Sequence, residues 1–474
     1  MSNRLRHIVE AIAITDLQQP DRPAINIAMT NSKIFCNVPW FHMHLYHDGS
    51  YGLCCSERAP HWDGYAKDPL KLKLNIKTTS IREWYRSEKM KHYRQQLLGD
   101  TKLPECAGCY QDEQYGNDSY RNTQNWRSVI FTQQNFQESF EQSPHYDIFH
   151  DEEYTGMPVD LHIDMGNECN LYCKHCNPSY STQIAAKYKV WGILDKQDYH
   201  TRMNWMDDDE VWDRFLNELL EIKNLRSVHF MGGEPTMSPR LDDFLDFFIK
   251  KNHTDFAVSM VTNGTRYSEE LVGKFSKFAR ADIDISIESI LDNNYYIRQG
   301  LDKELFTTNI DRFLSHQSDN FCVCLKPTIT ALTVSTFPEL IEYFFENDIV
   351  TENNTCWNPT YLRASALPLE IRESYFPKYE KVLAKLHQAI NDQNIDMPQS
   401  RDYTKNSVNL YNELLSVYRM IQVPEMPDAE AIKTELVSWL TKWDQSCELD
   451  ARDYYPEWTD FLEQYGYKKV SHTH

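Results

Sequence analysis

The chain has 474 residues, which leaves room for about three domains of roughly 150 residues each and excludes a disulfide-stapled miniature scaffold. Hydrophobic residues make up 41% of the chain and charged residues 25%, near the globular average, so wholesale disorder and fibrous architectures are excluded. The 49 Lys and Arg against 70 Asp and Glu give a net charge of −21, which repels phosphate backbones and anionic lipid headgroups, so we expect no nucleic acid and no membrane as partner.

The amino terminus carries one apolar run, Ile8–Ile14, which Glu10 interrupts and which is shorter than the ~18 residues that a bilayer span needs. We therefore expect no anchor, no secretion signal and a cytoplasmic location. In a reducing compartment, clustered cysteines indicate a metal or iron–sulfur site rather than disulfides. The twelve cysteines are Cys36, Cys54, Cys55, Cys106, Cys109, Cys169, Cys173, Cys176, Cys322, Cys324, Cys356 and Cys447.

The first 150 or so residues form a cysteine-bearing module rich in Tyr, Trp, His and Gln. Two short apolar runs, 40–46 and 51–55, flank an Asp48-Gly49 step, which favours a tight hairpin turn. Helical spacing then predicts one helix over 81–98. This module offers one candidate metal site, made by Cys36, the pair Cys54 and Cys55, and the pair Cys106 and Cys109.

Two ligand questions remain open in this module. Four thiolates hold an iron–sulfur cluster but also make an ordinary structural zinc site. The hairpin also carries three histidines, His42, His44 and His47. Because strand residues alternate, the first two share a face and the third lies on the other, so we expect packing or hydrogen bonding there rather than a metal.

From Pro158 to about Pro368, strand-like runs alternate with amphipathic helix-like segments, which indicates repeated βα units around a parallel sheet. The predicted strands span 159–165, 227–231, 256–262, 283–288, 321–328 and 350–357. The predicted helices span 208–222, 241–249, 268–281, 303–315 and 338–345. Six such units make an α/β fold of the incomplete (β/α)6, TIM-like barrel type. Isoleucines alternate with polar residues over 283–288, so we expect a polar interior where a ligand lies.

After Pro368 the sequence is helical in composition to its end and carries no chemical motif. The spacing of apolar residues predicts helices over 378–390, 407–421 and 429–443. We interpret this part as a cap or packing domain.

Three cysteines, Cys169, Cys173 and Cys176, form a C-x3-C-x2-C triplet directly after the first predicted barrel strand. Three thiolates hold three irons of a [4Fe-4S] cube and leave the fourth iron open for a substrate. The alternative is a zinc site, for which His175, inside the triplet, would supply the fourth ligand.

The triplet in this place resembles the signature of the radical S-adenosylmethionine (SAM) enzymes, and the resemblance covers about residues 158–365. A second match is the Gly232-Gly233-Glu234-Pro235 run after the second strand, where this family receives the methionyl amino group of SAM. Glycines let the backbone approach a ligand, and a carboxylate suits an ammonium group. By itself this run is also compatible with a plain turn.

Further matches to the family follow in order along the same βα pattern. They are Thr262-Asn263-Gly264-Thr265 after the third strand, Ser286 and Glu288 on the fourth, and Tyr296-Ile297-Arg298-Gln299-Gly300 beyond it. The resemblance implies that Ser286 contacts the ribose of SAM and that Arg298 binds its carboxylate, whereas the alternative for each is an interior polar residue. On the fifth strand, Cys322, Cys324 and Lys326 share one face, and a substrate cavity is one place for that face. Lys326 is a candidate for substrate binding there, whereas the alternative for the two cysteines, and the one we expect, is burial in the core.

The amino-terminal module resembles the auxiliary-cluster region called twitch, a shortened relative of SPASM, although in many relatives this module follows the barrel. The runs that carry the likeness are Asp48-Gly-Ser-Tyr-Gly-Leu-Cys-Cys55 and Pro104-Glu-Cys-Ala-Gly-Cys109. The cluster ligands implied are Cys36, Cys54, Cys106 and Cys109, with Cys55 as the substitute for Cys54 because only one of two successive strand residues faces the site. We expect Gly116, Ser119 and Arg121 to hold the geometry of this loop.

The resemblance implies three parts: an auxiliary cluster module over 1–150, a radical SAM core over 151–367 and a helical domain over 368–474. It implies that a [4Fe-4S] cluster gives one electron to SAM, which breaks into methionine and a 5′-deoxyadenosyl radical that takes hydrogen from a substrate. The implied partners are a peptide, protein or small-molecule substrate and an electron donor such as flavodoxin or ferredoxin. The alternative function is a non-catalytic zinc or iron–sulfur binding protein.

Overall fold

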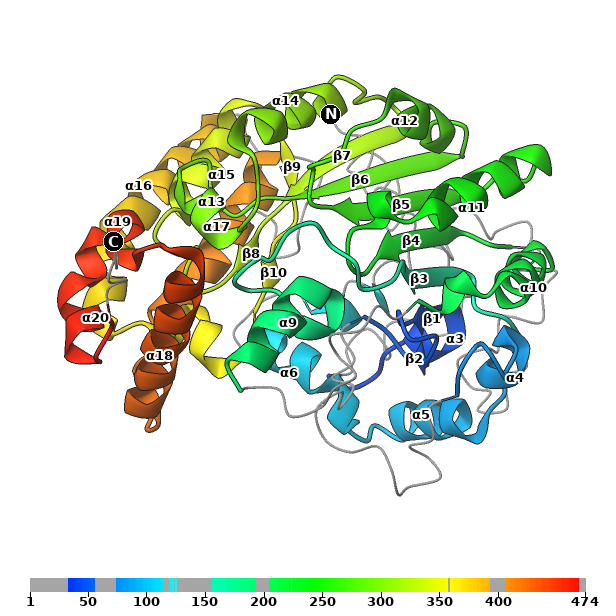
Figure 1. The fold of residues 1–474 in the computed structure, drawn as a ribbon, viewed down its shortest axis with the longest axis horizontal. Coiled ribbons are helices and arrows are strands. Elements are labelled where there is room, and N and C mark those ends of the chain that lie inside the picture. Colours follow the sequence, from blue (N-terminus) through cyan, green and yellow to red (C-terminus); the bar gives the residue numbers. More distant parts are fainter. Residues whose placement is uncertain are drawn as a thin grey trace.

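Eight strands form one sheet that curves through the middle of the computed structural model (Figure 1). The structure describes residues 33–55, 74–114, 119–122, 124–125, 156–192, 204–222, 224–356, 359–392 and 406–468. The order of the strands across the sheet is β2-β1-β3-β4-β5-β6-β7-β9. From β3 onward this order follows the chain, as successive βα units produce. The described strands make an open sheet with β2 and β9 at its edges.

Each of the six strands predicted for the barrel has a counterpart in the sheet that runs parallel to its neighbours. They are β3 (Asp160–Asp164), β4 (Ser227–Met231), β5 (Ala257–Thr262), β6 (Arg280–Ser286), β7 (Phe321–Lys326) and β9 (Val350–Thr351). The sixth, predicted over 350–357, is shorter than predicted, because only residues 350–351 join this sheet and residues 354–355 belong to a second one. The α/β class and the incomplete barrel are therefore confirmed. Strand β6 begins before its predicted start because residues 280–282 pair with residues 257–259 of β5, and the preceding helix ends correspondingly early.

The predicted hairpin is confirmed as β1 (His42–Leu45) and β2 (Tyr51–Gly52), which pair antiparallel. Its turn contains Gly49 at φ +84°, a conformation that suits glycine. Strand β1 also pairs in parallel with β3, residue for residue from His42 opposite Asp160 to Leu45 opposite Ile163. The amino-terminal module thus adds its strands to the barrel sheet, which the sequence analysis did not predict.

The predicted helix over 81–98 is two helices, α4 (Ile81–Tyr85) and α5 (Glu88–Leu98). The break follows from Ser87, whose extended backbone and side-chain hydrogen bond to the Met90 N–H cap a new helix. The remaining described helices of this module are α3 (Val38–Phe41) and α6 (Ala107–Gln114).

Helices cover the outer face of the sheet (Figure 1). They include α10 (Asp209–Leu220), α11 (Pro239–Lys250), α12 (Glu269–Phe275), α14 (Lys303–Leu314) and α15 (Phe337–Glu346), whereas α9 (Thr182–Val190) and α13 (Asn293–Ile297) lie toward the carboxy-terminal helices (Figure 1). The outward residues of the strands are apolar: Phe230 of β4 is fully buried, and its ring centroid lies 4.9 Å from that of Phe244 on α11. Full burial of one such side chain contributes about 1.5–3 kcal/mol. The opposite face carries polar residues such as His162 and Ser259, in line with the predicted polar interior.

The carboxy-terminal part is helical, as predicted. Its helices are α16 (Leu369–Asp392), α17 (Asn406–Ile421), α18 (Ala429–Cys447), α19 (Ala451–Tyr454) and α20 (Thr459–Gln464). Short strands β8 (Thr328–Ile329) and β10 (Asn354–Thr355) pair beside β7 and β9. Within the part of the chain that the structure describes, no helix combines the length and apolar character that a bilayer span requires, and the run Ile8–Ile14 lies outside that part.

Candidate functional site

The cysteine triplet lies in the loop that leaves the carboxyl end of β3 and leads to α9 (Figure 1). Backbone hydrogen bonds fasten this loop to the segment after α13: the Tyr172 N–H donates to the Gln299 carbonyl at 3.1 Å and the Lys174 N–H to the Ile297 carbonyl at 2.8 Å. The loop is therefore fixed in place by the chain itself. It lies at the end of the sheet where barrels of this type carry their chemistry.

The three thiols of the loop lie close enough to influence one another. Burial, followed by the charge of the Cys173 thiol, raises the pKa of Cys169 to about 12. Burial also raises the pKa of Cys173 and, together with the other two thiols, that of Cys176. Iron reverses this effect, because binding removes the thiol proton and the metal charge stabilises the thiolate. These residues therefore fit an iron–sulfur cluster.

The second loop, after β4, runs directly against the cysteine loop. The Gly233 N–H donates to the Gly166 carbonyl at 2.9 Å, and the Glu234 N–H donates to the Glu168 carbonyl at 2.8 Å. A Cβ atom on Gly233 would lie 2.1 Å from the Glu168 carbonyl oxygen, a distance that no side chain tolerates. Gly232 adopts φ +111°, where other residues are strained. The glycines therefore allow two loops of this chain to touch.

The carboxylate of Glu234 is almost fully buried, with an exposed fraction of 2%. It accepts four hydrogen bonds: from the N–H and hydroxyl of Thr236, from the Thr262 hydroxyl at 2.7 Å and from the Asn263 N–H at 2.7 Å. The Asn263 amide in turn donates to the Cys169 sulfur at 3.7 Å. Glu234 thus ties the loops after β4 and β5 to the cysteine loop.

Two further residues implied by the resemblance form a buried ion pair. Arg298 donates from Nη1 to Oε1 of Glu288 at 3.0 Å, and Nε2 of His175 lies 3.4 Å from the same oxygen. Among the described residues, Nε of Arg298 and Nδ1 of His175 have no hydrogen-bond partner although both are buried. Arg298 also interacts electrostatically with the Cys173 and Cys169 thiols. An unused guanidinium donor beside the thiols suits the carboxylate of a ligand.

The remaining candidate residues lie on two neighbouring strands of the barrel, β6 and β7. Ser286 is the last residue of β6, opposite Lys326 of β7. The ammonium group of Lys326 lies 2.8 Å from Asp284 and 3.1 Å from Glu352, so internal carboxylates already engage it. Cys322 and Cys324 are buried in the same strand, as expected for core residues.

One group that no sequence motif revealed reaches the cysteine loop from the carboxy-terminal helices. Nζ of Lys174, between two cysteines of the triplet, lies 2.7 Å from Oδ1 of Asp444 on α18, and both side chains are fully buried. The Tyr296 hydroxyl donates to the same carboxylate at 2.9 Å and the Tyr467 hydroxyl at 2.6 Å. Helix α18, predicted as a cap without a motif, therefore holds the cysteine loop.

The cysteines proposed for the second site are all buried in the amino-terminal module: Cys36, Cys54, Cys106 and Cys109. Burial raises the pKa of Cys36 to about 11; burial and the Cys36 charge raise that of Cys109 to about 12. Cys55 is less buried and interacts with His44 instead. This arrangement favours Cys54 as the ligand.

Two of the residues expected to hold this loop, Ser119 and Arg121, contact the helix that follows it. Arg121 donates to Glu113 of α6 at 2.8 and 2.6 Å and to the Phe35 carbonyl at 2.8 Å, and the Ser119 hydroxyl donates to Glu113. The Arg121 charge also acts on the Cys36 and Cys109 thiols. Gly116 lies outside the described residues.

A buried network joins this module to the end of β3. Nε2 of His44 lies 3.2 Å from Oδ1 of Asp164, and Nδ1 of His47 lies 3.8 Å from Oδ2. Burial lowers the pKa of His44, but the attraction and hydrogen bond of Asp164, with the contact to Cys55, outweigh it and raise the pKa to about 9. The expected hydrogen bonding is present for His44, whereas His47, expected on the other face of the hairpin, approaches the same carboxylate without a hydrogen bond.

Two family models match the chain. Residues 163–344 match the Radical SAM superfamily, and residues 36–110 match SPASM, an iron-sulfur cluster-binding domain. Among solved structures, native anSMEcpe with bound AdoMet is 20% identical to this chain and gives a TM-score of 0.37. The match covers 50% of this chain and 62% of the anSMEcpe chain. Streptococcus suis SuiB bound to precursor peptide SuiA is 13% identical and gives a TM-score of 0.35. The match covers 65% of this chain and 64% of the SuiB chain. The chain thus spans less than two thirds of either structure's length, and no curated protein matches it.

Proposed function

Since the chain is a radical SAM enzyme whose amino-terminal module is an iron–sulfur cluster-binding domain of the SPASM type, we propose that it abstracts hydrogen from a peptide or protein side chain. Its cofactors are [4Fe-4S] clusters and SAM. The non-catalytic alternative is set aside, because the matched superfamily is one of enzymes. The three-part division at residues 150 and 367 is retained as part of this proposal.

One observation carries the assignment of the SAM-binding cluster. The loop after β3 brings the three thiols close enough together for their charges to act on one another. Three thiolates leave one iron of a cubane open to SAM. When bound to Cys169, Cys173 and Cys176, the cluster supplies the electron that cleaves SAM into methionine and a 5′-deoxyadenosyl radical.

The chain's own residues then bind and orient SAM. We assign its carboxylate to the unused Nε–H of Arg298, because this buried donor lies beside the cysteine loop. Gly232 and Gly233 shape the loop that receives the methionyl group, and Glu234 fixes that loop through its four internal hydrogen bonds. Ser286, at the end of β6, is assigned to the ribose.

The amino-terminal module is proposed to hold an auxiliary [4Fe-4S] cluster. Its ligands are Cys36, Cys54, Cys106 and Cys109, which are all buried in a module where Arg121 places a positive charge beside two of the thiols. Four thiolates close the coordination of such a cluster. An anionic thiolate cluster is stabilised by a neighbouring guanidinium.

The charge of the protein favours a basic peptide as substrate. The net charge of −21 produces a field that attracts cations and repels anions, and this attraction weakens with salt. The electron donor is proposed to be a small redox protein such as flavodoxin or ferredoxin.

The test is anaerobic reconstitution followed by iron and sulfide counting and a SAM-cleavage assay with dithionite. The native chain is compared with Cys173→Ala and with Cys356→Ala, a control cysteine outside both proposed sites. The proposal expects about eight irons in the native chain and about four in Cys173→Ala. It also expects 5′-deoxyadenosine from the native chain and from Cys356→Ala, but not from Cys173→Ala. Bound zinc without iron, or cleavage that survives in Cys173→Ala, refutes it.

The substrate class is tested separately. Native enzyme is incubated with matched peptide pools that differ only in net charge. Each incubation is done in normal buffer and in deuterated buffer, and the amount of 5′-deoxyadenosine and the mass of the peptides are measured. The proposal expects turnover with basic peptides that falls as salt rises. If the enzyme modifies only small metabolites while it still cleaves SAM, the assignment of a peptide substrate is wrong but the radical SAM function stands.

A further inference from the structure

A row of histidines crosses three neighbouring strands on the inner face of the sheet. His44 of β1 pairs with His162 of β3, and His162 pairs with His229 of β4. Because side chains alternate along a strand, His42 shares the face of His44, and Asp160 shares the face of His162. The strand pairing therefore gathers imidazoles and one carboxylate from two parts of the chain that lie 118 residues apart.

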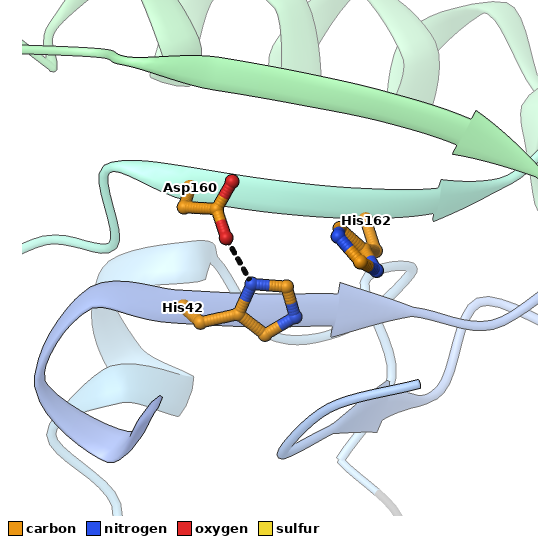
Figure 2. A group of neighbouring side chains, drawn as sticks. All are labelled: His42, Asp160 and His162. Atoms are coloured by element: carbon orange, nitrogen blue, oxygen red, sulfur yellow. Dashed lines mark hydrogen bonds and ion pairs between the residues drawn. The ribbon is translucent and has the colours of Figure 1, made fainter. Parts of the chain in front are cut away.

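Three of these side chains form a compact group. One ligand atom from each of His42, Asp160 and His162 lies within 4.8 Å of the other two. Figure 2 shows His42 on β1 turned toward Asp160 on β3, with His162 beside them on the same strand. Nδ1 of His42 lies 2.7 Å from Oδ2 of Asp160, and the His42 and His162 ring centroids are 4.4 Å apart, with the rings nearly perpendicular.

The group is enclosed, with one side open to solvent. The exposed fraction is 1% for His42 and 9% for His162, whereas the Asp160 side chain is 22% exposed. Nε2 of His42 is buried and has no hydrogen-bond partner among the residues that the structure describes. Two imidazoles and a carboxylate gathered in this way are ligands that zinc takes, and the partly exposed carboxylate gives an ion a path of access.

We propose that His42, Asp160 and His162 bind one divalent transition-metal cation of the zinc type. Two imidazoles and a carboxylate are ligands that zinc takes, at about 2.0–2.2 Å, and a water on the exposed side completes a tetrahedron. The ion displaces the proton shared by His42 and Asp160, which leaves to solvent. Small side-chain movements bring the three atoms from within 4.8 Å of one another to bonding distance of a common centre.

The location indicates a structural role. His42 and Asp160 are the first residues of β1 and β3, at the amino ends of these strands, whereas the cysteine triplet follows the carboxyl end of β3. The site is therefore separate from the SAM-binding loop, and it contains no cysteine. A metal here joins the strand contributed by the amino-terminal module to the first strand of the barrel.

The test uses the native holoprotein, purified anaerobically with its clusters and dialysed against Zn²⁺ and then metal-free buffer. We expect about one zinc per chain, with a zinc-edge X-ray absorption spectrum that shows nitrogen and oxygen at about 2.0–2.2 Å and no sulfur shell at about 2.3 Å. His42→Gln and His162→Gln should weaken Zn²⁺ binding about tenfold or more, as second-shell or ligand losses do, with unchanged iron. The control is His253→Gln, a half-buried histidine beside Asp255 and outside the group.

The proposal is overturned if the native protein retains no zinc, if sulfur appears in the zinc shell, or if both variants bind Zn²⁺ like the control. The absorption spectrum of the native protein decides the ligand type even if a variant fails to fold. Asp160→Asn provides a third variant that keeps the shape of the side chain, and it should also lose zinc.

Discussion

The buried ion pair between the cysteine loop and α18 gives the sharpest stability prediction. In Asp444→Ala, the Lys174 ammonium loses the carboxylate that lies 2.7 Å away, and the hydroxyls of Tyr296 and Tyr467 lose their acceptor. Lys174 then keeps the faces of the Tyr296 and Trp443 rings, whose centroids lie 4.2 and 5.4 Å from Nζ, and an electrostatic attraction to Cys447. Such ring contacts contribute about 2 kcal/mol or more when the cation is desolvated, but they are already present in the native protein and do not replace the carboxylate.

The expected loss of stability is about 3–5 kcal/mol, because removing one partner of a buried pair leaves an uncompensated charge. For a domain of 150–250 residues this lowers the melting temperature by about 6–20 °C. Lys174 lies between Cys173 and Cys176. The same change should therefore loosen the loop and reduce the iron retained after gel filtration.

The measurement is anaerobic thermal and urea unfolding of the holoprotein. The double variant Lys174→Met/Asp444→Leu should recover much of the loss, because apolar groups of similar size often replace a buried pair at little cost. Glu435→Ala, an exposed acid on the same helix, should change stability by less than about 0.5 kcal/mol. A loss below about 1 kcal/mol in Asp444→Ala, or a double variant no better than the single one, would refute the reasoning.

Three further predictions concern other parts of the molecule. Gly233→Ala should weaken SAM binding by about tenfold or more in equilibrium dialysis, because its Cβ would meet the Glu168 carbonyl, whereas Gly273→Ala, with open space around it, should bind SAM normally. Cys106→Ala should hold about four irons instead of about eight and still cleave SAM, and unchanged iron would remove this cysteine from the ligand set. Burial raises the pKa of Glu425, but hydrogen bonds from a lysine on α18 and a backbone N–H outweigh it and hold the pKa below 4.5. Glu425 therefore stabilises the fold above about pH 4.5, and the difference in unfolding free energy between native and Glu425→Gln should shrink as the pH falls below that value, whereas a constant difference would contradict the assignment.

Local patterns predicted the elements of the barrel well. The six strands occur where short apolar runs predicted them, since burial on the helix-covered face requires β-forming apolar residues at alternate positions. The boundaries were less certain: Ser87 splits a predicted helix by capping its second half, and β6 starts early because its neighbour extends that far. Both differences arise from hydrogen bonds that hydrophobic spacing does not encode.

The cysteine triplet and the glycine loop were also recognisable from the sequence, because their spacing along the chain is itself the signal. The function of single residues within the loops was less accessible. The sequence suggests that Glu234 meets an ammonium group of the ligand, yet in the fold four internal donors surround its carboxylate. Which donors reach a buried carboxylate depends on how three loops meet, and no one loop contains that information.

The sequence by itself determined the fold class, the order of the barrel strands and the cysteine and glycine runs proposed to carry the cluster chemistry, because each depends on neighbours a few positions apart. Only the tertiary structure placed β1 beside β3, His42 beside Asp160 and His162, and Asp444 beside Lys174. The last pair is separated by 270 residues along the chain. Contacts of this kind arise when separate elements pack their buried faces together, and the choice of partner among many buried polar groups is made by the whole fold.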